Sequence, residues 1–151
     1  MASHLDYSKI LLCLATLLGL CGCVSTDGVE SDPIMLSTNR LHQAARFALV
    51  DSIKSRSQNT RTYISHHHIP GTDVNALAKP GEPRGQVTIH ILGDRRPYRL
   101  LVVYRVDKYE NGTYHFDRYD NEIAQKFLKR MQDYLASRPV ERDMIDDFKP
   151  Y

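Results

Sequence analysis

Three consecutive histidines, His66-His67-His68, are the side chains in this 151-residue chain that most readily suggest chemistry. They lie in the segment TRTYISHHHIPG, whose β-branched and aromatic residues predict a strand that ends at Pro70-Gly71. On a strand, His66 and His68 share a face, and paired imidazoles can bind zinc or copper. A metal site needs further converging ligands, so the same residues are also compatible with a solvated strand end.

Arginine and tyrosine side chains recur between positions 95 and 105 and form the second candidate site. Arginine pairs with carboxylates and phosphates through a planar fork, and tyrosine offers amphipathic contact area. The pattern predicts a basic and aromatic patch that binds an acidic protein surface or an anionic polymer. The alternative is a charged strand face that keeps a sheet soluble. The predicted patch consists of Arg95, Arg96, Tyr98, Arg99, Tyr104 and Arg105.

No sequence signature of an enzyme accompanies these candidates. The chain has no Gly-x-Ser-x-Gly elbow, no His-Glu-x-x-His motif and no glycine-rich phosphate loop, and residues 24–151 contain no cysteine. The net charge of +2 is too small to suggest nucleic acid as a partner. We therefore expect a non-catalytic domain that uses no cofactor and binds no nucleic acid.

The N-terminus indicates where the protein resides. An apolar run of eleven residues, Ile10 to Leu20, matches the apolar core of a signal peptide. It is too short to span the hydrocarbon core of a bilayer, which is about 30 Å thick. The run leads into Leu20-Cys21-Gly22-Cys23, which resembles the lipobox of bacterial lipoproteins. That pattern has an aliphatic residue three positions before the modified cysteine and a small residue directly before it.

The resemblance implies that Cys23 is acylated and becomes the first residue of a mature protein anchored in a membrane. An aspartate directly after the acylated cysteine resembles the inner-membrane retention signal of many Gram-negative bacteria. Val24 occupies that position here, so we expect the protein on the periplasmic face of the outer membrane rather than on the inner membrane. The expected organisation is a signal peptide over 1–22, a lipidated N-terminus and tether over 23–36, a folded domain over 37–138 and a C-terminal tail over 139–151.

Two amphipathic helices are predicted near the ends of the folded domain. In the first, apolar residues recur at helical spacing from Leu41 to Ile53, after candidate capping residues at positions 37–39. The second follows Asp120 as its cap and covers residues 121–136. One side of this helix is apolar, and its lysine and arginine side chains face water.

Strands are predicted between the helices, around residues 60–69, 85–93 and 97–109. The last of these is apolar on both faces at its start, which is typical of a central strand covered on both sides. Asn111-Gly112 predicts a type I′ hairpin to a fourth strand. A strict two-residue turn would place Asp107 opposite Phe116, which is an awkward pairing of a carboxylate with an aromatic ring. A β-bulge or a longer loop is therefore an alternative to the strict turn. The order α-β-β-β-β-α predicts an α+β fold, with two helices on one face of a mostly antiparallel sheet of about four strands.

Together these features predict an outer-membrane lipoprotein with a non-catalytic binding domain, an accessory or structural component of a cell-envelope assembly. The expected partners are the membrane, through the lipid anchor, and an envelope protein or an anionic envelope polymer. The element order is similar in outline to the small lipoproteins that brace lipopolysaccharide-transport and barrel-assembly machines, although the chain carries no motif of those families. The alternative is a periplasmic small-ligand or metal-binding lipoprotein that uses the His66–His68 cluster.

Overall fold

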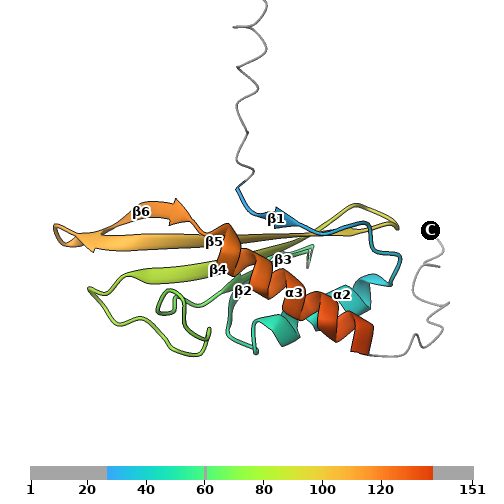
Figure 1. Ribbon diagram of the computed structural model, residues 1–151, viewed down its shortest axis with the longest axis horizontal. Helices are drawn as coiled ribbons and strands as arrows, with labels where there is room; N and C mark the ends of the chain where they lie inside the picture. The colour runs from blue at the N-terminus through green and yellow to red at the C-terminus, as the bar shows by residue number, and fades with distance from the viewer. Residues whose placement is uncertain (1–26, 60, 138–151) are drawn as a thin grey trace, which may run out of the picture.

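The computed structural model describes residues 27–59 and 61–137. Within them, six strands and two helices follow one another in the order β1-α2-β2-β3-β4-β5-β6-α3 (Figure 1). The strands are β1 (Val29–Glu30), β2 (Ile53–Arg56), β3 (Thr62–Ser65), β4 (Arg84–Leu92), β5 (Arg99–Glu110) and β6 (Thr113–Tyr119), and the helices are α2 (Thr38–Ala48) and α3 (Asn121–Ser137). The predicted α+β class is confirmed, and the sheet has six strands rather than the four expected.

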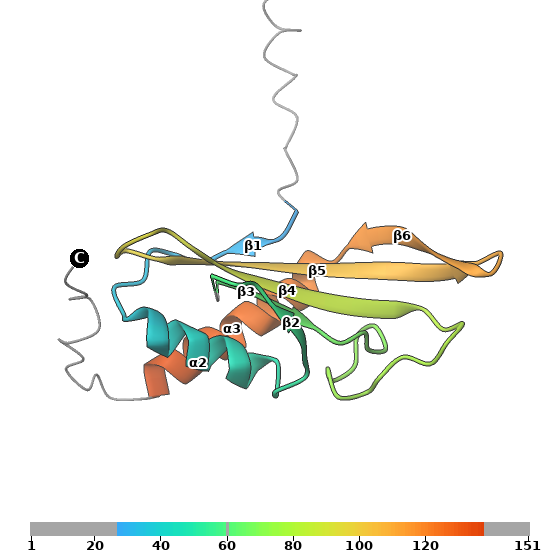
Figure 2. The ribbon, with the colours of Figure 1, turned by 180° about the vertical axis from the view of Figure 1, so that it is seen from behind.

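The sheet is antiparallel throughout, with the strand order β1-β5-β4-β3-β2. β5 is the longest strand at 12 residues, and β4 occupies one of its edges. The other edge of β5 is therefore shared by two strands, since β1 pairs Val29 with Val102 and β6 pairs Tyr119 with Arg105. Figures 1 and 2 show β1 and β6 one after the other along β5.

One face of the sheet is covered by both helices, which lie against each other (Figure 2). Alternate residues of β4 and β5 point to this covered face and are buried there, as the period of a strand requires. The apolar side chains of the helices complete the core. The strands contribute Val87, Ile89, Ile91, Leu100, Val102, Tyr104 and Val106, and the helices Leu41, Ala44, Ala45, Ala48, Ala124, Phe127, Leu128, Met131 and Leu135.

The opposite face of the sheet, which we name the open face, is covered only in part. Leu101 and Val103 of β5 point to it and are half-buried. The backbone of Gly28 lies against them, because a Cβ added at Gly28 would stand 2.9 Å from Val103 Cγ2 and 2.7 Å from the Val102 carbonyl oxygen. Gly28 also has a φ of +121°, which only glycine adopts readily. The predicted cover on both faces of β5 is thus limited to this short stretch.

The folded domain begins earlier than the predicted boundary at residue 37. The Ser31 amide donates to the Leu100 carbonyl at 2.8 Å, and Ile34 and Tyr98 exchange two backbone hydrogen bonds of 2.7 and 2.9 Å. These bonds satisfy backbone groups along the first half of β5 that would otherwise form an open sheet edge. Much of the segment predicted as a tether is therefore fixed to the sheet.

α2 is shorter than the periodic pattern predicted. It ends at Ala48, and Val50 and Asp51 follow with φ values of 49° and 56° in the left-handed region. Ile53, which was in phase with the apolar side of the helix, instead begins β2. The predicted second helix is confirmed, and Asp120 caps it, since its Oδ1 accepts from the Ile123 amide at 3.1 Å.

The hairpin between β5 and β6 has the predicted two-residue turn. Asn111 and Gly112 have φ values of 51° and 84°, and the flanking residues pair directly. Asp107 does face Phe116, and a β-bulge follows between Val106 and Asp107. The tight turn and the bulge therefore occur together, and the bulge shifts the pairing by one residue before the strands reach the sheet centre.

Candidate functional site

The predicted arginine and tyrosine patch does not form one surface. Tyr98 and Tyr104 are only 5% and 1% exposed and belong to the core beneath the helices. Tyr104 stacks on Phe127 with ring centroids 6.2 Å apart, and its hydroxyl is hydrogen-bonded to His68 Nε2 at 3.1 Å. Both tyrosines are corrections to the predicted site, because strand alternation directs them to the covered face.

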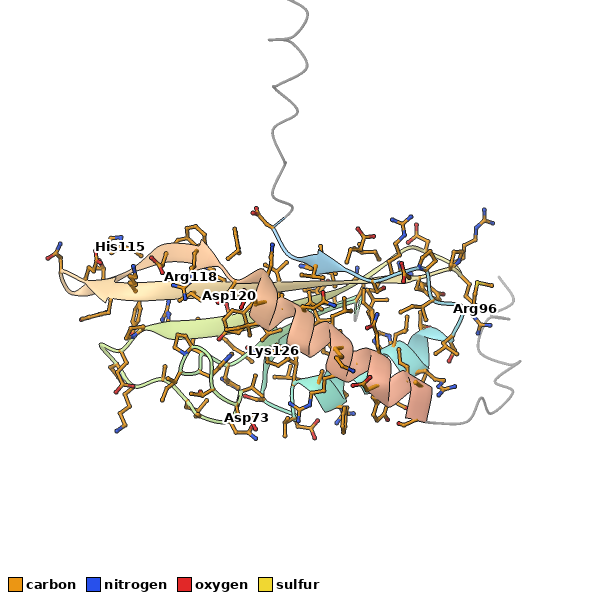
Figure 3. All side chains as sticks on the ribbon, in the orientation of Figure 1. Asp73, Arg96, His115, Arg118, Asp120 and Lys126 are labelled. Carbon is orange, nitrogen blue, oxygen red and sulfur yellow. The ribbon has the colours of Figure 1, made fainter. Side chains whose placement is uncertain are left out.

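The four arginines of that patch are spread along the sheet. Arg95 and Arg96 lie in the loop between β4 and β5, and Figure 3 shows Arg96 at the opposite end of the sheet from Arg118. Arg99 and Arg105 share the open face, but six residues of strand separate them by roughly 20 Å. Arg99 is also engaged in an ion pair of 2.9 Å with the glutamate of β1. These side chains therefore cannot hold one ligand together.

The three histidines point in different directions, because β3 ends at Ser65. His66 is exposed, His67 is half-buried and His68 is fully buried, so the prediction that His66 and His68 share a strand face is wrong. Both ring nitrogens of His68 have partners, the Tyr104 hydroxyl at 3.1 Å and the His66 carbonyl at 3.2 Å. Among residues 27–59 and 61–137, no group of three or more His, Cys, Asp and Glu side chains could hold a metal ion.

Burial favours the neutral form of His67 and His68. It lowers the pKa of His68, and it lowers the pKa of His67 to about 4 with a further contribution from the charge of Arg84. His68 therefore bonds to Tyr104 and to the His66 carbonyl as a neutral ring rather than as a charged one.

The β5–β6 hairpin carries aromatic side chains that the sequence analysis did not select. Tyr109 and Tyr114 meet edge to face with ring centroids 4.9 Å apart, and Phe116 and Tyr119 are 4.8 Å apart. We name these four residues the hairpin aromatic cluster. Tyr119 pairs directly with Arg105, so its side chain lies on the open face. Phe116 is 49% exposed, so the cluster presents apolar surface to its surroundings.

The charges around the hairpin aromatic cluster are paired with one another. The buried carboxylate of Asp107 accepts from Arg84 Nε at 3.2 Å and from Arg105 Nε at 2.6 Å. Asp117 is paired with Lys108 and with Arg118, each at 2.6 Å. Hydrogen bonding to Lys108 lowers the pKa of Asp117. Residues 105–119 contain three basic and three acidic side chains, which gives a net charge of zero.

The guanidinium groups of that network also cover aromatic rings. The Arg84 guanidinium carbon lies 3.7 Å from the centroid of Tyr114, and that of Arg105 lies 5.4 Å from the centroid of Phe116. Cation–π contact of this kind holds an arginine flat against the ring. The hairpin surface is therefore a fixed arrangement of aromatic rings with internally paired charges.

A groove of about 630 Å³ lies between α2 and α3, on the side of the helices that faces away from the sheet. At its centre Phe47 stacks on Tyr134 with ring centroids 4.6 Å apart, and Phe47 is 48% exposed. The groove is lined by Phe47, Lys126, Lys129, Arg130, Asp133, Tyr134 and Ser137.

The rim of the groove is positively charged. Lys126, Lys129 and Arg130 contribute three positive charges against the single negative charge of Asp133, which gives +2. Asp133 forms its ion pair with Lys129 at 2.9 Å, and the Arg130 guanidinium lies 5.6 Å from the ring of Phe47. The groove therefore offers an apolar centre with basic groups beside it.

A second hollow of about 300 Å³ borders the first. It shares Lys126 and Arg130 with the groove, and it is closed on its other side by Thr72, Asp73 and Phe127. Figure 3 shows Lys126 on α3 above the loop that carries Asp73. Lys126 and Arg130 thus stand between two hollows and can reach a ligand in either.

The sequence contained one signal for the groove. Lys126, Lys129 and Arg130 were predicted to face water, and they are exposed. Phe47 was not among the predicted site residues. It is a large aromatic residue that lies next to the apolar stripe of Ala44, Ala45 and Ala48 rather than within it. An aromatic side chain in that position predicts exposed apolar surface on a helix.

The proposed lipidation site, Cys23, lies outside the described residues. In the part of the chain that the structure describes, no helix is long and apolar enough to cross a membrane. No protein-family model matches the chain, and no curated protein is significantly similar to it.

Proposed function

We propose that this protein is an outer-membrane lipoprotein, anchored through acylated Cys23 on the periplasmic face, whose α+β domain binds an envelope protein without catalysing a reaction. The groove between α2 and α3 is the binding site. Phe47 supports this proposal most directly, because its ring is half-exposed and stacks on Tyr134 inside a basic rim.

The chemistry of the groove selects the kind of partner. Aromatic residues and arginine are enriched where proteins bind one another, and Phe47, Tyr134 and Arg130 meet at the centre of this site. The net charge of +2 on the rim complements an acidic segment. We therefore assign as occupant a segment of the partner in which an apolar side chain is flanked by aspartate or glutamate.

A small anionic ligand is the less suitable occupant. The groove volume of about 630 Å³ falls within the range of small-molecule sites, roughly 300–1,000 Å³. Such sites, however, bury most of the surface of their ligand, and the exposure of Phe47 leaves this groove open on one side. An open apolar groove on a helix pair suits a polypeptide segment, which covers the groove with its own chain.

Site-specific photo-cross-linking tests the proposal in the native envelope. A photoreactive residue at Phe47 of the full, acylated chain should cross-link to one protein, and the cross-linked peptide should contain acidic residues beside an apolar one. Phe116 is the matched control position, because it is 49% exposed where Phe47 is 48% exposed, and it lies on the open face. Intact-mass analysis of the same preparation establishes whether Cys23 carries acyl chains.

Charge reversal then tests the assigned chemistry. The double change Lys126→Glu and Arg130→Glu should reduce the Phe47 cross-link at least about tenfold, and lysine substitutions at the acidic positions of the partner should restore it. The binding proposal is overturned if charge reversal leaves the cross-link unchanged. It is also overturned if the cross-linked peptide belongs to residues 138–151 of this chain itself. A mass without acyl chains overturns the anchor.

A further inference from the structure

The hairpin aromatic cluster lies beside the point at which the chain enters the folded domain. β1 and β6 share one edge of β5, and Gly28 packs against Val103 while Tyr119 pairs with Arg105. Val103 and Arg105 are two residues apart on β5 and point to the same face, which places them about 7 Å apart. The entry point and the Tyr119 end of the hairpin aromatic cluster are therefore neighbours on the open face.

A lipid on Cys23 would hold this part of the domain close to the membrane. Gly28 follows Cys23 by five residues, and five extended residues reach at most about 17 Å. The headgroup layer of one leaflet is about 5–8 Å thick. Gly28 is fixed against β5 by its close approach to Val102 and Val103. The residues after Gly28 therefore cannot detach to lengthen the connection between Cys23 and the domain. This step rests on the proposed lipid anchor.

We propose that the hairpin aromatic cluster is a membrane-contact surface that inserts into the headgroup layer of the bilayer that holds the anchor. Tyrosine rings are apolar with one polar end, and they collect at the membrane–water interface for that reason. Phe116 supplies a fully apolar ring between them, and Arg105 lies over that ring with its charge directed to Asp107. The anchor keeps the surface at high local concentration near the bilayer, so a modest affinity is sufficient.

The contact depends on the aromatic rings rather than on net charge. Asp107 is paired with Arg84 and Arg105, and Asp117 with Lys108 and Arg118. Residues 105–119 have a net charge of zero, to which Arg84 adds one positive charge. A polybasic surface would require anionic lipids and would be released by salt. The hairpin surface should instead bind a bilayer of neutral lipids equally well.

This orientation leaves the proposed binding groove accessible. The groove lies on the far side of the helices, and the helices themselves cover the face of the sheet opposite to the open face. With the open face on the membrane, Phe47 and the basic rim point toward the periplasm. The anchor, the membrane contact and the partner site can therefore act at the same time.

The chain contains no tryptophan, so a single introduced tryptophan reports on one position. Full-length acylated protein with Phe116→Trp, and separately with Tyr119→Trp, is reconstituted into vesicles of phosphatidylethanolamine and phosphatidylglycerol. Lipids brominated on their acyl chains are the quenchers. Phe47→Trp is the matched control, because Phe47 is as exposed as Phe116 but lies in the groove.

We expect blue-shifted emission and at least about twofold quenching by brominated lipid at positions 116 and 119, with no quenching at position 47. The quenching should persist when phosphatidylglycerol is replaced by phosphatidylcholine and when salt is raised about tenfold. The inference is overturned if positions 116 and 119 remain unquenched in protein whose mass shows acylation, or if position 47 is quenched equally. Protein without acyl chains would instead contradict the proposed anchor, so the two failures are distinguishable.

Discussion

The contact between Gly85 and Tyr104 allows one substitution to be analysed quantitatively. Gly85 lies on β4 and points to the covered face of the sheet. A Cβ added to it would stand 2.6 Å from Tyr104 Cζ and closer still to the Tyr104 hydroxyl oxygen. Real Cβ atoms do not approach a ring so closely, so Tyr104 would have to move. Its hydroxyl is hydrogen-bonded to His68 Nε2, and both residues are buried. Gly85→Ala therefore overpacks the core around Tyr104 and also breaks the hydrogen bond between Tyr104 and His68.

The expected cost has two parts. Overpacking a well-filled core costs about 1–3 kcal/mol. A buried polar group left without its partner costs about 1–3 kcal/mol more. We expect Gly85→Ala to lower the free energy of unfolding by about 4 kcal/mol, a large fraction of the roughly 5–15 kcal/mol that stabilises a typical domain. Tyr104→Phe alone loses the hydrogen bond without overpacking and should cost about 1–3 kcal/mol.

The double variant separates these two parts. Combining Gly85→Ala with Tyr104→Phe removes the atom in the closest conflict, and the hydrogen bond to His68 is lost only once. The two changes should therefore cost at least about 1 kcal/mol less together than the sum of their separate costs. Urea unfolding followed by far-ultraviolet circular dichroism measures all four corners of this cycle. Strictly additive costs would refute the reasoning.

Two further predictions concern helix capping and pH. Asp120→Ala should lower the free energy of unfolding by about 1 kcal/mol, because it removes the cap on the Ile123 amide. Ser37→Ala should change the free energy of unfolding little, because Ser37 makes no side-chain cap bond to α2. Urea unfolding midpoints compare the two variants, and equal losses would contradict the assignment of Asp120 as the cap. Burial lowers the pKa of His68, and that of His67 to about 4, so the unfolded chain binds more protons than the folded chain below pH 6.5. The free energy of unfolding should be constant above that pH and fall between pH 6.5 and about 4, with a shallower fall in His67→Gln; a pH-independent stability measured by urea titration would exclude this effect.

The elements that the sequence predicted well are those with a strong local pattern. The stripe of the second helix, the alternation of β4 and β5 and the Asn111-Gly112 turn each depend on residues close together in the chain, and all three are present. Ile53 was assigned wrongly because its spacing continued the helical period, while Val50 and Asp51 had already reversed the chain. β1 could not be predicted, since two residues show no period and their partner lies far along the chain.

The candidate site was only partly predictable for a related reason. Tyr104 has the same strand parity as Leu100 and Val102, so alternation alone assigns it to the core, and grouping it with Arg105 by nearness in sequence was wrong. The exposed positions of Lys126 and Arg130 followed from the helical period. The groove itself depends on how α2 meets α3, and the hairpin aromatic cluster depends on a bulge; neither is encoded in a local pattern.

If Cys23 carries the proposed lipid, the pairing of β1 with β5 has a further consequence, because folding then shortens the connection to that anchor. Val29 pairs with Val102, 73 positions later in the chain, so β1 cannot join the sheet until β5 has formed. Before that pairing forms, the 13 residues 24–36 separate Cys23 from the folded part of the chain, and afterwards only the five positions to Gly28 do. With that lipid in place, completion of the sheet would draw the domain toward the bilayer, and the spacing between bilayer and domain would be a property of the folded state.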